Sequence, residues 1–132
     1  MPRELSSYLF AYGFLKRKFH GNEKTQTPDF EHRFVSEGTL TGDIYRVDVF
    51  PGVIYDDQIE NLVHGEVFEL MDPEHALRIL DRYENAKPLV HLDPDYERRL
   101  RPIKTDQGIL NCWVYEYLKP VNPATIIESG EF

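Results

Sequence analysis

The chain has 132 residues, which suffices for one hydrophobic core but not for two independently folding ones, so we predict a single domain over residues 1–132. The content of 41% hydrophobic and 13% aromatic residues excludes a disordered chain. Fifteen Lys and Arg against 23 Asp and Glu give a net charge of -8, which argues against nucleic acid and against a membrane surface as partners.

Two further features of the composition limit the protein's location and chemistry. No apolar run approaches the roughly 18 residues needed to cross a bilayer, and no signal-type segment follows Met1–Glu4, so we expect a cytoplasmic protein. Cys112 is the only cysteine, which excludes an internal disulfide and predicts a buried thiol within an apolar run. The histidines lack metal-ligand spacing and are expected at the surface, and we predict neither a metal nor a cofactor. These histidines are His20, His32, His64, His75 and His91.

Three strands are predicted in the first half of the chain. The aromatic and apolar run Tyr8–Tyr12 stops at Gly13, which is typical of a buried strand that enters a turn. Gly38–Phe50 mixes apolar residues with Thr and Asp and is interpreted as one long or bent strand that Pro51-Gly52 ends. Val63–Leu70 alternates in polarity and forms the third strand.

One strong helix is predicted after these strands. Asp72 can cap free N–H groups, and Pro73 suits the first helical position. The helix runs to Glu84, and Asn85 is suited to the left-handed conformation that stops it. Residues spaced by three and four form its core-facing stripe. They are Ala76, Leu77, Leu80 and Tyr83.

The remaining segments complete the expected fold. Tyr96–Lys104 and Ile109–Tyr117 flank a Gly-containing loop and predict a hairpin. Thr27–Ser36 is interpreted as a short polar helix opened by Pro28. The tail over residues 121–130 should pack against the body with Ile126 or Ile127 buried. Because the predicted strands outnumber the one strong helix, we predict an α+β fold. It is built on a small, barrel-like curved sheet whose strands are mixed or antiparallel.

Two local features can carry chemistry, although standard hydrolase and nucleotide-binding motifs are absent. Gly13 lets the backbone turn and expose successive N–H groups, which can hold a carboxylate; an ordinary strand exit with solvated basic residues fits as well. Glu84 faces the negative end of the helix dipole, so partial burial would push it toward its neutral form and suit a proton shuttle. A solvated Glu at a helix end is the alternative.

The combined pattern resembles the gamma-glutamylcyclotransferase-like family, in a compact bacterial subgroup. An N-terminal strand ends in Tyr12-Gly-Phe-Leu15 followed by basic residues, similar to the family's Tyr-Gly-Ser/Thr-Leu. The remaining similar segments follow in the family's order, and the resemblance spans residues 8–130. They are Asn22, Phe50-Pro-Gly-Val53, Val63-His-Gly-Glu-Val-Phe68, Leu80-Asp-Arg-Tyr-Glu84, Tyr96-Glu-Arg98, Cys112-Trp-Val-Tyr115, Lys119-Pro-Val-Asn122 and Ile127-Glu-Ser-Gly130.

This resemblance implies a function for both local features. Tyr12, Gly13, Phe14 and Leu15 would bind the glutamyl end of a gamma-glutamyl amine or peptide, and Glu84 would be the acid/base of a cyclisation that releases 5-oxoproline. Two departures from the family pattern bear on the substrate: Phe14 stands where Ser or Thr is usual, and Asn85 where Gly is usual. The first removes a hydroxyl donor and narrows the pocket.

Two other readings stay open at this point. A non-catalytic member could bind a glutamyl-type metabolite in the same pocket, although the presence of Glu84 argues against it. An interaction protein is suggested by the many Tyr and Phe residues and by the apolar tail, which could cover a dimer seam. We expect a small-molecule gamma-glutamyl substrate as partner, and a monomer or weak homodimer.

Overall fold

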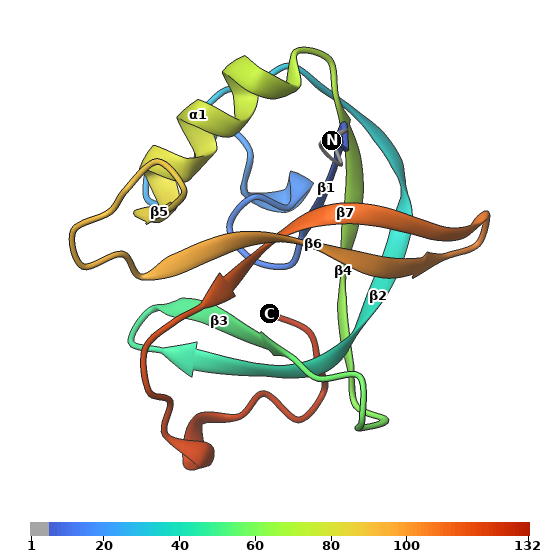
Figure 1. Ribbon diagram of the computed structural model, residues 1–132, viewed down its shortest axis with the longest axis vertical. Coiled ribbons are helices and arrows are strands. Elements are labelled where there is room, and N and C mark those ends of the chain that lie inside the picture. Colours follow the sequence, from blue (N-terminus) through green and yellow to red (C-terminus); the bar gives the residue numbers. More distant parts are fainter. Residues whose placement is uncertain (1–5) are drawn as a thin grey trace, which may run out of the picture.

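The computed structural model describes residues 6–132, and Figure 1 shows a curved sheet with one main helix against it. Met1–Glu4, after which we expected no signal-type segment, lies outside the described residues. Within 6–132 no helix has the length and apolar character needed to span a membrane. The elements in chain order are β1 (Tyr8–Ala11), η1 (Arg17–Phe19), β2 (His32–Val47), β3 (Phe50–Tyr55), β4 (Leu62–Leu70), α1 (Pro73–Glu84), β5 (Ala86–Lys87), β6 (Tyr96–Thr105), β7 (Gly108–Tyr117) and η2 (Pro123–Thr125).

The strands form one sheet that closes on itself. Their order is β1-β4-β2-β3-β7-β6-β5, and two additional pairings, β1 with β7 and β2 with β6, connect the remaining edges. Strands β1, β4, β2, β6 and β7 therefore make a closed ring. The β1–β7 pairing is parallel, through Leu9 and Trp113, whereas β6 and β7 form an antiparallel hairpin. The predicted barrel-like mixed sheet of the α+β class is confirmed.

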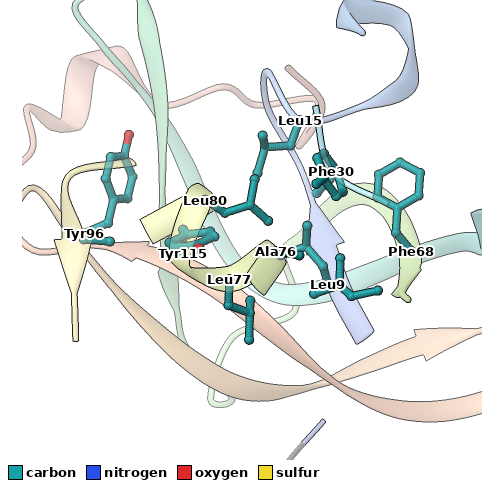
Figure 2. Packing of buried hydrophobic residues seen from close by; sticks show 12 residues of the cluster. Leu9, Leu15, Phe30, Phe68, Ala76, Leu77, Leu80, Tyr96 and Tyr115 are labelled. Carbon is teal, nitrogen blue, oxygen red and sulfur yellow. The ribbon is translucent and has the colours of Figure 1, made fainter. Parts of the chain in front are cut away.

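Alternation along the strands divides the core into two clusters. In β1, Leu9 and Ala11 belong to the cluster beneath α1, and Phe10 belongs to the cluster that fills the barrel. Successive side chains of a strand point to opposite faces, so a single strand supplies both clusters. Figure 2 shows Leu77 and Leu80 of α1 lying close to Tyr115 of β7, and Ala76 lying close to Leu9; all of them belong to one cluster. The helix therefore covers the outer face of the barrel.

Helix α1 has the predicted bounds. Its first turn is capped by the Asp72 carboxylate, which accepts a hydrogen bond from the His75 N–H at 3.4 Å. Asn85 ends it in the left-handed conformation, with φ 53° and ψ 54°. The predicted stripe is buried except for Tyr83, which is half-buried. Asp81, which the periodicity did not include, is buried as well.

The helix expected over Thr27–Ser36 was wrong. Strand β2 already begins at His32 and pairs with β4 from Leu70 onward. The polarity of this segment comes from the outward face of a strand, where Arg33 forms an ion pair with Glu69 on β4 at 2.8 Å. Cross-strand ion pairs of this kind stabilise a sheet, so the charged residues fit a strand as well as they fit a solvated helix.

The single strand expected over Gly38–Phe50 is in fact two. Strand β2 ends at Val47, and β3 begins at Phe50 and includes Pro51 and Gly52, which were expected to stop the run. Proline fits here because β3 pairs with β2 on one side but meets β7 only at Val53 on the other. Pro51 thus occupies an edge position.

The tail packs against the body as predicted, although Ile126 and Ile127 are half-buried instead of fully buried. The Ile127 N–H donates to the Ile44 carbonyl at 2.8 Å, and the His64 N–H donates to the Gly130 carbonyl at 2.8 Å. Gly130 has a positive φ of 75°, and a Cβ there would lie 2.0 Å from the Leu62 carbonyl oxygen, so only glycine fits.

Cys112 is buried, as expected. The surface prediction holds for His64, His75 and His91 but not for the other two histidines. His20 and His32 are half-buried and lie edge to face, with ring centres 5.0 Å apart, beside Phe68. These rings behave as aromatic packing partners, a role that sequence spacing does not reveal.

Candidate active site

All five residues predicted for the site line one cavity of about 780 Å³. The cavity lies where β1 and α1 end, where β6 begins and where β2 turns into β3. Residues 12–15 and Glu84 are therefore brought together although 69 positions separate Leu15 from Glu84 (84 - 15 = 69). The expectation that they share one pocket is met.

The loop after β1 is positioned by close contact with β3. A Cβ on Gly13 would lie 2.6 Å from the Pro51 side chain, so glycine is needed here for space and not for a left-handed backbone. The Lys16 N–H donates to the Gly13 carbonyl at 3.1 Å and closes the turn. The N–H groups of Phe14 and Leu15 have no acceptor among residues 6–132. The turn therefore presents free backbone donors.

The Phe14 side chain packs into an aromatic cluster at the edge of the cavity. Its ring meets those of Phe19, Phe50 and Phe132 edge to face, at centroid distances of 5.1, 5.8 and 5.2 Å. The ring is held by packing in the place where the family usually has a small hydroxyl residue. Phe14 therefore shapes the cavity by its bulk and supplies no side-chain hydrogen bond.

Two tyrosine hydroxyl groups are fixed by backbone acceptors in the inner part of the cavity. The Tyr12 hydroxyl donates to the Tyr115 carbonyl, and the Tyr96 hydroxyl donates to the Pro51 carbonyl at 2.7 Å. Burial raises the pKa of Tyr12, and the neighbouring Tyr96 and Glu84 raise it further. Each phenol has only one proton to donate, so what remains toward the cavity is acceptor lone pairs.

Glu84 is the carboxylate of this cavity. Its side chain is half-buried, and it has no hydrogen bond or ion pair with any residue of the segment 6–132. The pKa of Glu84 is raised to about 8, first because protein atoms surround the carboxylate and then because Asp81 and Asp95 lie nearby. The Glu84 carboxylate is therefore accessible from the cavity and yet largely removed from bulk water. The group can exist in either protonation state near neutral pH.

A second carboxylate, Asp81, lies one turn earlier on α1 and is fully paired. Its oxygens accept from the Arg98 guanidinium at 2.8 and 3.2 Å and from the Tyr115 hydroxyl at 2.7 Å. Arg98 in turn stacks on the Trp113 ring at 4.3 Å. This network connects α1 to β6 and β7 directly beneath the site.

The end of α1 is held by the loop that precedes β6. The Asn85 side chain donates to Asp95 at 3.1 Å, and Asp95 pairs with Lys119 at 2.9 Å. This pairing lowers the pKa of Asp95. Asn85, Gln26 and Asp48 have positive φ values and all line the cavity. Such conformations persist where the surrounding structure enforces them, which is common at functional sites.

Several lining residues were not predicted as site residues from the sequence, chiefly Tyr96, Tyr115 and Pro51. Tyr96 and Tyr115 stand in β6 and β7, whose pattern predicts only a hairpin, and the closure of the barrel is what brings both residues to the cavity that Glu84 lines. All three residues lie in segments that resemble the family pattern, and that resemblance was the available signal. In the described part of the chain, no group of three or more His, Cys, Asp or Glu is arranged to hold a metal ion.

Comparison with known families decides the classification. Residues 9–132 match the family described as gamma-glutamyl cyclotransferase, AIG2-like. The chain belongs to this family. No curated protein matches the chain in sequence.

Solved structures share the AIG2-like fold. An AIG2-like protein from Mus musculus has a TM-score of 0.72 at 20% identity, covering 98% of this chain and 89% of the other. Protein YtfP from Escherichia coli has a TM-score of 0.64 at 26% identity, covering 95% of both chains. YkqA from Bacillus subtilis has a TM-score of 0.67 at 22% identity and covers 97% of this chain, which spans only 40% of the length of YkqA.

Proposed function

We propose that this AIG2-like protein is a cyclotransferase that acts on gamma-glutamyl amines or peptides and releases 5-oxoproline and a free amine, with Glu84 as acid/base. The observation that carries the proposal is the unpaired Glu84 carboxylate, with its pKa near 8, in the cavity that also contains the Tyr12–Leu15 turn. A group poised near the working pH is suited to proton transfer in both directions. The proposed setting is the cytoplasm, with the protein a monomer or weak homodimer.

The inner cavity offers complementary partners for the glutamyl end of such a substrate. The free N–H groups of Phe14 and Leu15 suit the α-carboxylate, because successive backbone donors form an anion-binding concavity. The acceptor lone pairs of the Tyr12 and Tyr96 hydroxyls, together with Glu84, suit the α-ammonium group. Both charged groups of the glutamyl unit would therefore be bound, and the chain would be held folded.

The reaction follows from this placement. Glu84 accepts a proton from the α-ammonium group, and the freed amine attacks the γ-carbonyl carbon to form a five-membered ring. The bond between that carbon and the leaving nitrogen then breaks as Glu84 returns its proton to the leaving nitrogen. The restored Glu84 carboxylate takes the second proton of the ring nitrogen and releases it to solvent. The products are the lactam 5-oxoproline and a free amine. The nucleophile and the electrophile belong to one molecule, so most of the rate gain comes from positioning.

The raised pKa of Glu84 predicts how the rate depends on pH. The carboxylate is the form that accepts the first proton, and its population grows as the pH rises toward about 8. We therefore expect kcat/KM to rise from pH 6 and to level off above pH 8, which a pH profile of 5-oxoproline release measures. A profile that is already flat at pH 6 would contradict the assignment of this pKa to the catalytic group.

The direct test is incubation with a panel of gamma-glutamyl compounds and mass detection of 5-oxoproline. Glu84→Gln keeps the shape and removes the titrating group, so we expect the rate to fall by about 10² to 10⁴-fold with substrate binding largely retained. Glu74→Gln, on the exposed first turn of the same helix, is the matched control and should leave the rate unchanged.

Two outcomes would overturn parts of the proposal. Glu84→Gln activity within about twofold of wild type would place the proton shuttle on another group. A wild-type protein that releases no 5-oxoproline from any compound, but binds some of them, would favour a non-catalytic binding protein for a glutamyl-type metabolite.

A further inference from the structure

The turn between β2 and β3 presents two adjacent apolar side chains to solvent at the mouth of the cavity. Val49 is 59% exposed and Phe50 is 49% exposed, and both line the cavity. Large apolar residues are scattered singly on most protein surfaces, but two in sequence at the rim of a binding cavity form a small patch. Because both side chains are exposed to solvent, they are not part of the barrel core.

The cavity has a buried inner part and an exposed rim. Tyr12, Leu15 and Tyr96 in the inner part are at most 7% exposed, whereas residues 48–50 at the rim are exposed. If the glutamyl unit is bound at the inner part, as the proposed function requires, the only direction left for the leaving amine is toward the rim. Whatever substituent the leaving nitrogen carries then meets Val49 and Phe50.

The charges at the rim indicate which substituent is favoured. Among the lining residues, Lys24 and Asp48 are exposed and have formal charges of opposite sign, and Asp95 is paired with Lys119. The rim therefore offers little net attraction to a charged group. The segment around Lys24 is tied to α1, because the Tyr83 hydroxyl donates to the Thr25 carbonyl at 2.8 Å. An apolar substituent would instead remove the surfaces of Val49 and Phe50 from water, which is favourable.

We propose that the rim formed by Val49 and Phe50 is the subsite for the leaving amine, and that it selects amines with an apolar, preferably aromatic, substituent. The Phe50 ring is already placed by its edge-to-face contact with Phe14, at 5.8 Å. An aromatic ring of the substrate can extend this cluster in the geometry that such rings prefer. The inference rests on the proposed function, because it takes the glutamyl unit at the inner part as given.

The backbone of the turn supports a preformed subsite. Asp48 adopts a positive φ of 58°, a conformation that favours glycine, and the ladder of β2 and β3 holds Val47 opposite Phe50 on either side of it. The turn is therefore fixed before substrate arrives. A preformed apolar surface loses little conformational entropy on binding.

The experiment compares gamma-glutamyl-phenylalanine with gamma-glutamyl-glycine, which differ only by a benzyl group on the leaving amino acid. We expect wild-type kcat/KM for 5-oxoproline release to be about tenfold or more higher for the phenylalanine compound, within the range of apolar-pocket discrimination. Val49→Ser and Phe50→Ser should each reduce this ratio several-fold. Ile109→Ser is the matched control, because Ile109 is 69% exposed beside the β6–β7 turn and away from the cavity.

The outcomes separate this inference from the proposed function. Equal kcat/KM for the two compounds, or a ratio that Phe50→Ser and Val49→Ser leave unchanged, would overturn the amine subsite while cyclisation stands. A wild-type protein that cyclises neither compound, nor any other in the panel, would overturn both. Sedimentation analysis gives a further criterion: a wild-type dimer that Phe50→Ser converts to a monomer would make the patch a subunit contact and also overturn the subsite.

Discussion

Two carboxylates on consecutive turns of α1, Asp81 and Glu84, have opposite surroundings. Asp81 is 3% exposed, and its oxygens are satisfied by Arg98 and by the Tyr115 hydroxyl. Glu84 points into the cavity without a partner among residues 6–132, and its pKa is raised to about 8. The residues are three positions apart on the same side of a helix, so packing against different neighbours is what distinguishes them.

The difference shows how the fold gives two carboxylates of one helix different roles: Asp81 connects neighbouring elements, and Glu84 is available to a ligand. A buried carboxylate that is paired and hydrogen-bonded remains ionised and connects the elements around it. A carboxylate that lacks such partners binds its proton more tightly and is free to exchange it with a ligand. After burial, the nearby Asp81 is a further cause of the raised pKa of Glu84, so the carboxylate that is paired influences the one that is not.

Removing the charge of Asp81 should produce the largest loss of stability. Asp81→Asn leaves the Arg98 guanidinium, which has only 10% of its side chain exposed, without a counter-charge. We expect the free energy of unfolding to fall by about 3–5 kcal/mol, as measured by urea denaturation at pH 7. A loss below about 0.5 kcal/mol would mean that the pairing of Asp81 with Arg98 stabilises the protein little, and that the contrast with Glu84 is smaller than their contacts indicate.

Removing the charge of Glu84 should have the opposite effect on stability. The pKa of Glu84 is raised from 4.5 to about 8, so the native state holds a proton that the unfolded chain releases between these pH values. Wild-type stability therefore falls as the pH rises through this window, and Glu84→Gln abolishes that part of the fall. We expect Glu84→Gln to be about 2 kcal/mol more stable than wild type at pH 8.5, which is less than the full linkage because Glu84 is half-buried and lines an open cavity.

This second comparison has an internal control. At pH 5 wild-type Glu84 is protonated and resembles Gln, so the two proteins should then unfold at similar urea concentrations. A Glu84→Gln protein that is less stable than wild type at pH 8.5 would indicate that the carboxylate has a stabilising partner after all.

Tyr115→Phe should sharpen the comparison with a smaller effect. The substitution removes the hydroxyl that donates to Asp81 and leaves the Arg98 pair and the Tyr115 backbone carbonyl intact. We expect a loss of about 1 kcal/mol in the free energy of unfolding. Combined with Asp81→Asn, the loss should be less than the sum of the two single effects, because the hydroxyl would already lack its charged acceptor. Strict additivity would contradict a shared network.

The sequence predicts those elements whose signals are local. Helix α1 was found with its bounds because Asp72, Pro73 and Asn85 mark its ends through their own backbone preferences. The hairpin of β6 and β7 was found for the same reason, from a Gly-containing loop between two strand-like segments. Residues 12–15 and Glu84 were found through motif resemblance, since their local chemistry fits solvated residues equally well.

What the sequence does not predict depends on contacts across the closed sheet. The start of β2 was misread because the charges of Arg33 and Glu69 meet only after β2 and β4 pair. Asp81 was overlooked because its burial depends on Arg98, which lies 17 positions away. Pro51, taken for a strand breaker, lies inside β3 because one side of β3 is almost free. Each miss is a tertiary effect that overrides a local preference.

The closing of the barrel through β1 and β7 also bears on how the protein folds. Leu9 pairs with Trp113, so the ring is complete only when segments more than 100 positions apart have met. Contacts of such long range form slowly and late, whereas α1 and the β6–β7 hairpin can form locally. The Tyr12–Leu15 turn leaves β1, and Tyr115 belongs to β7. In a refolding experiment, the proposed cyclotransferase activity should therefore be the last property to return, after helical structure and after most of the β-sheet signal.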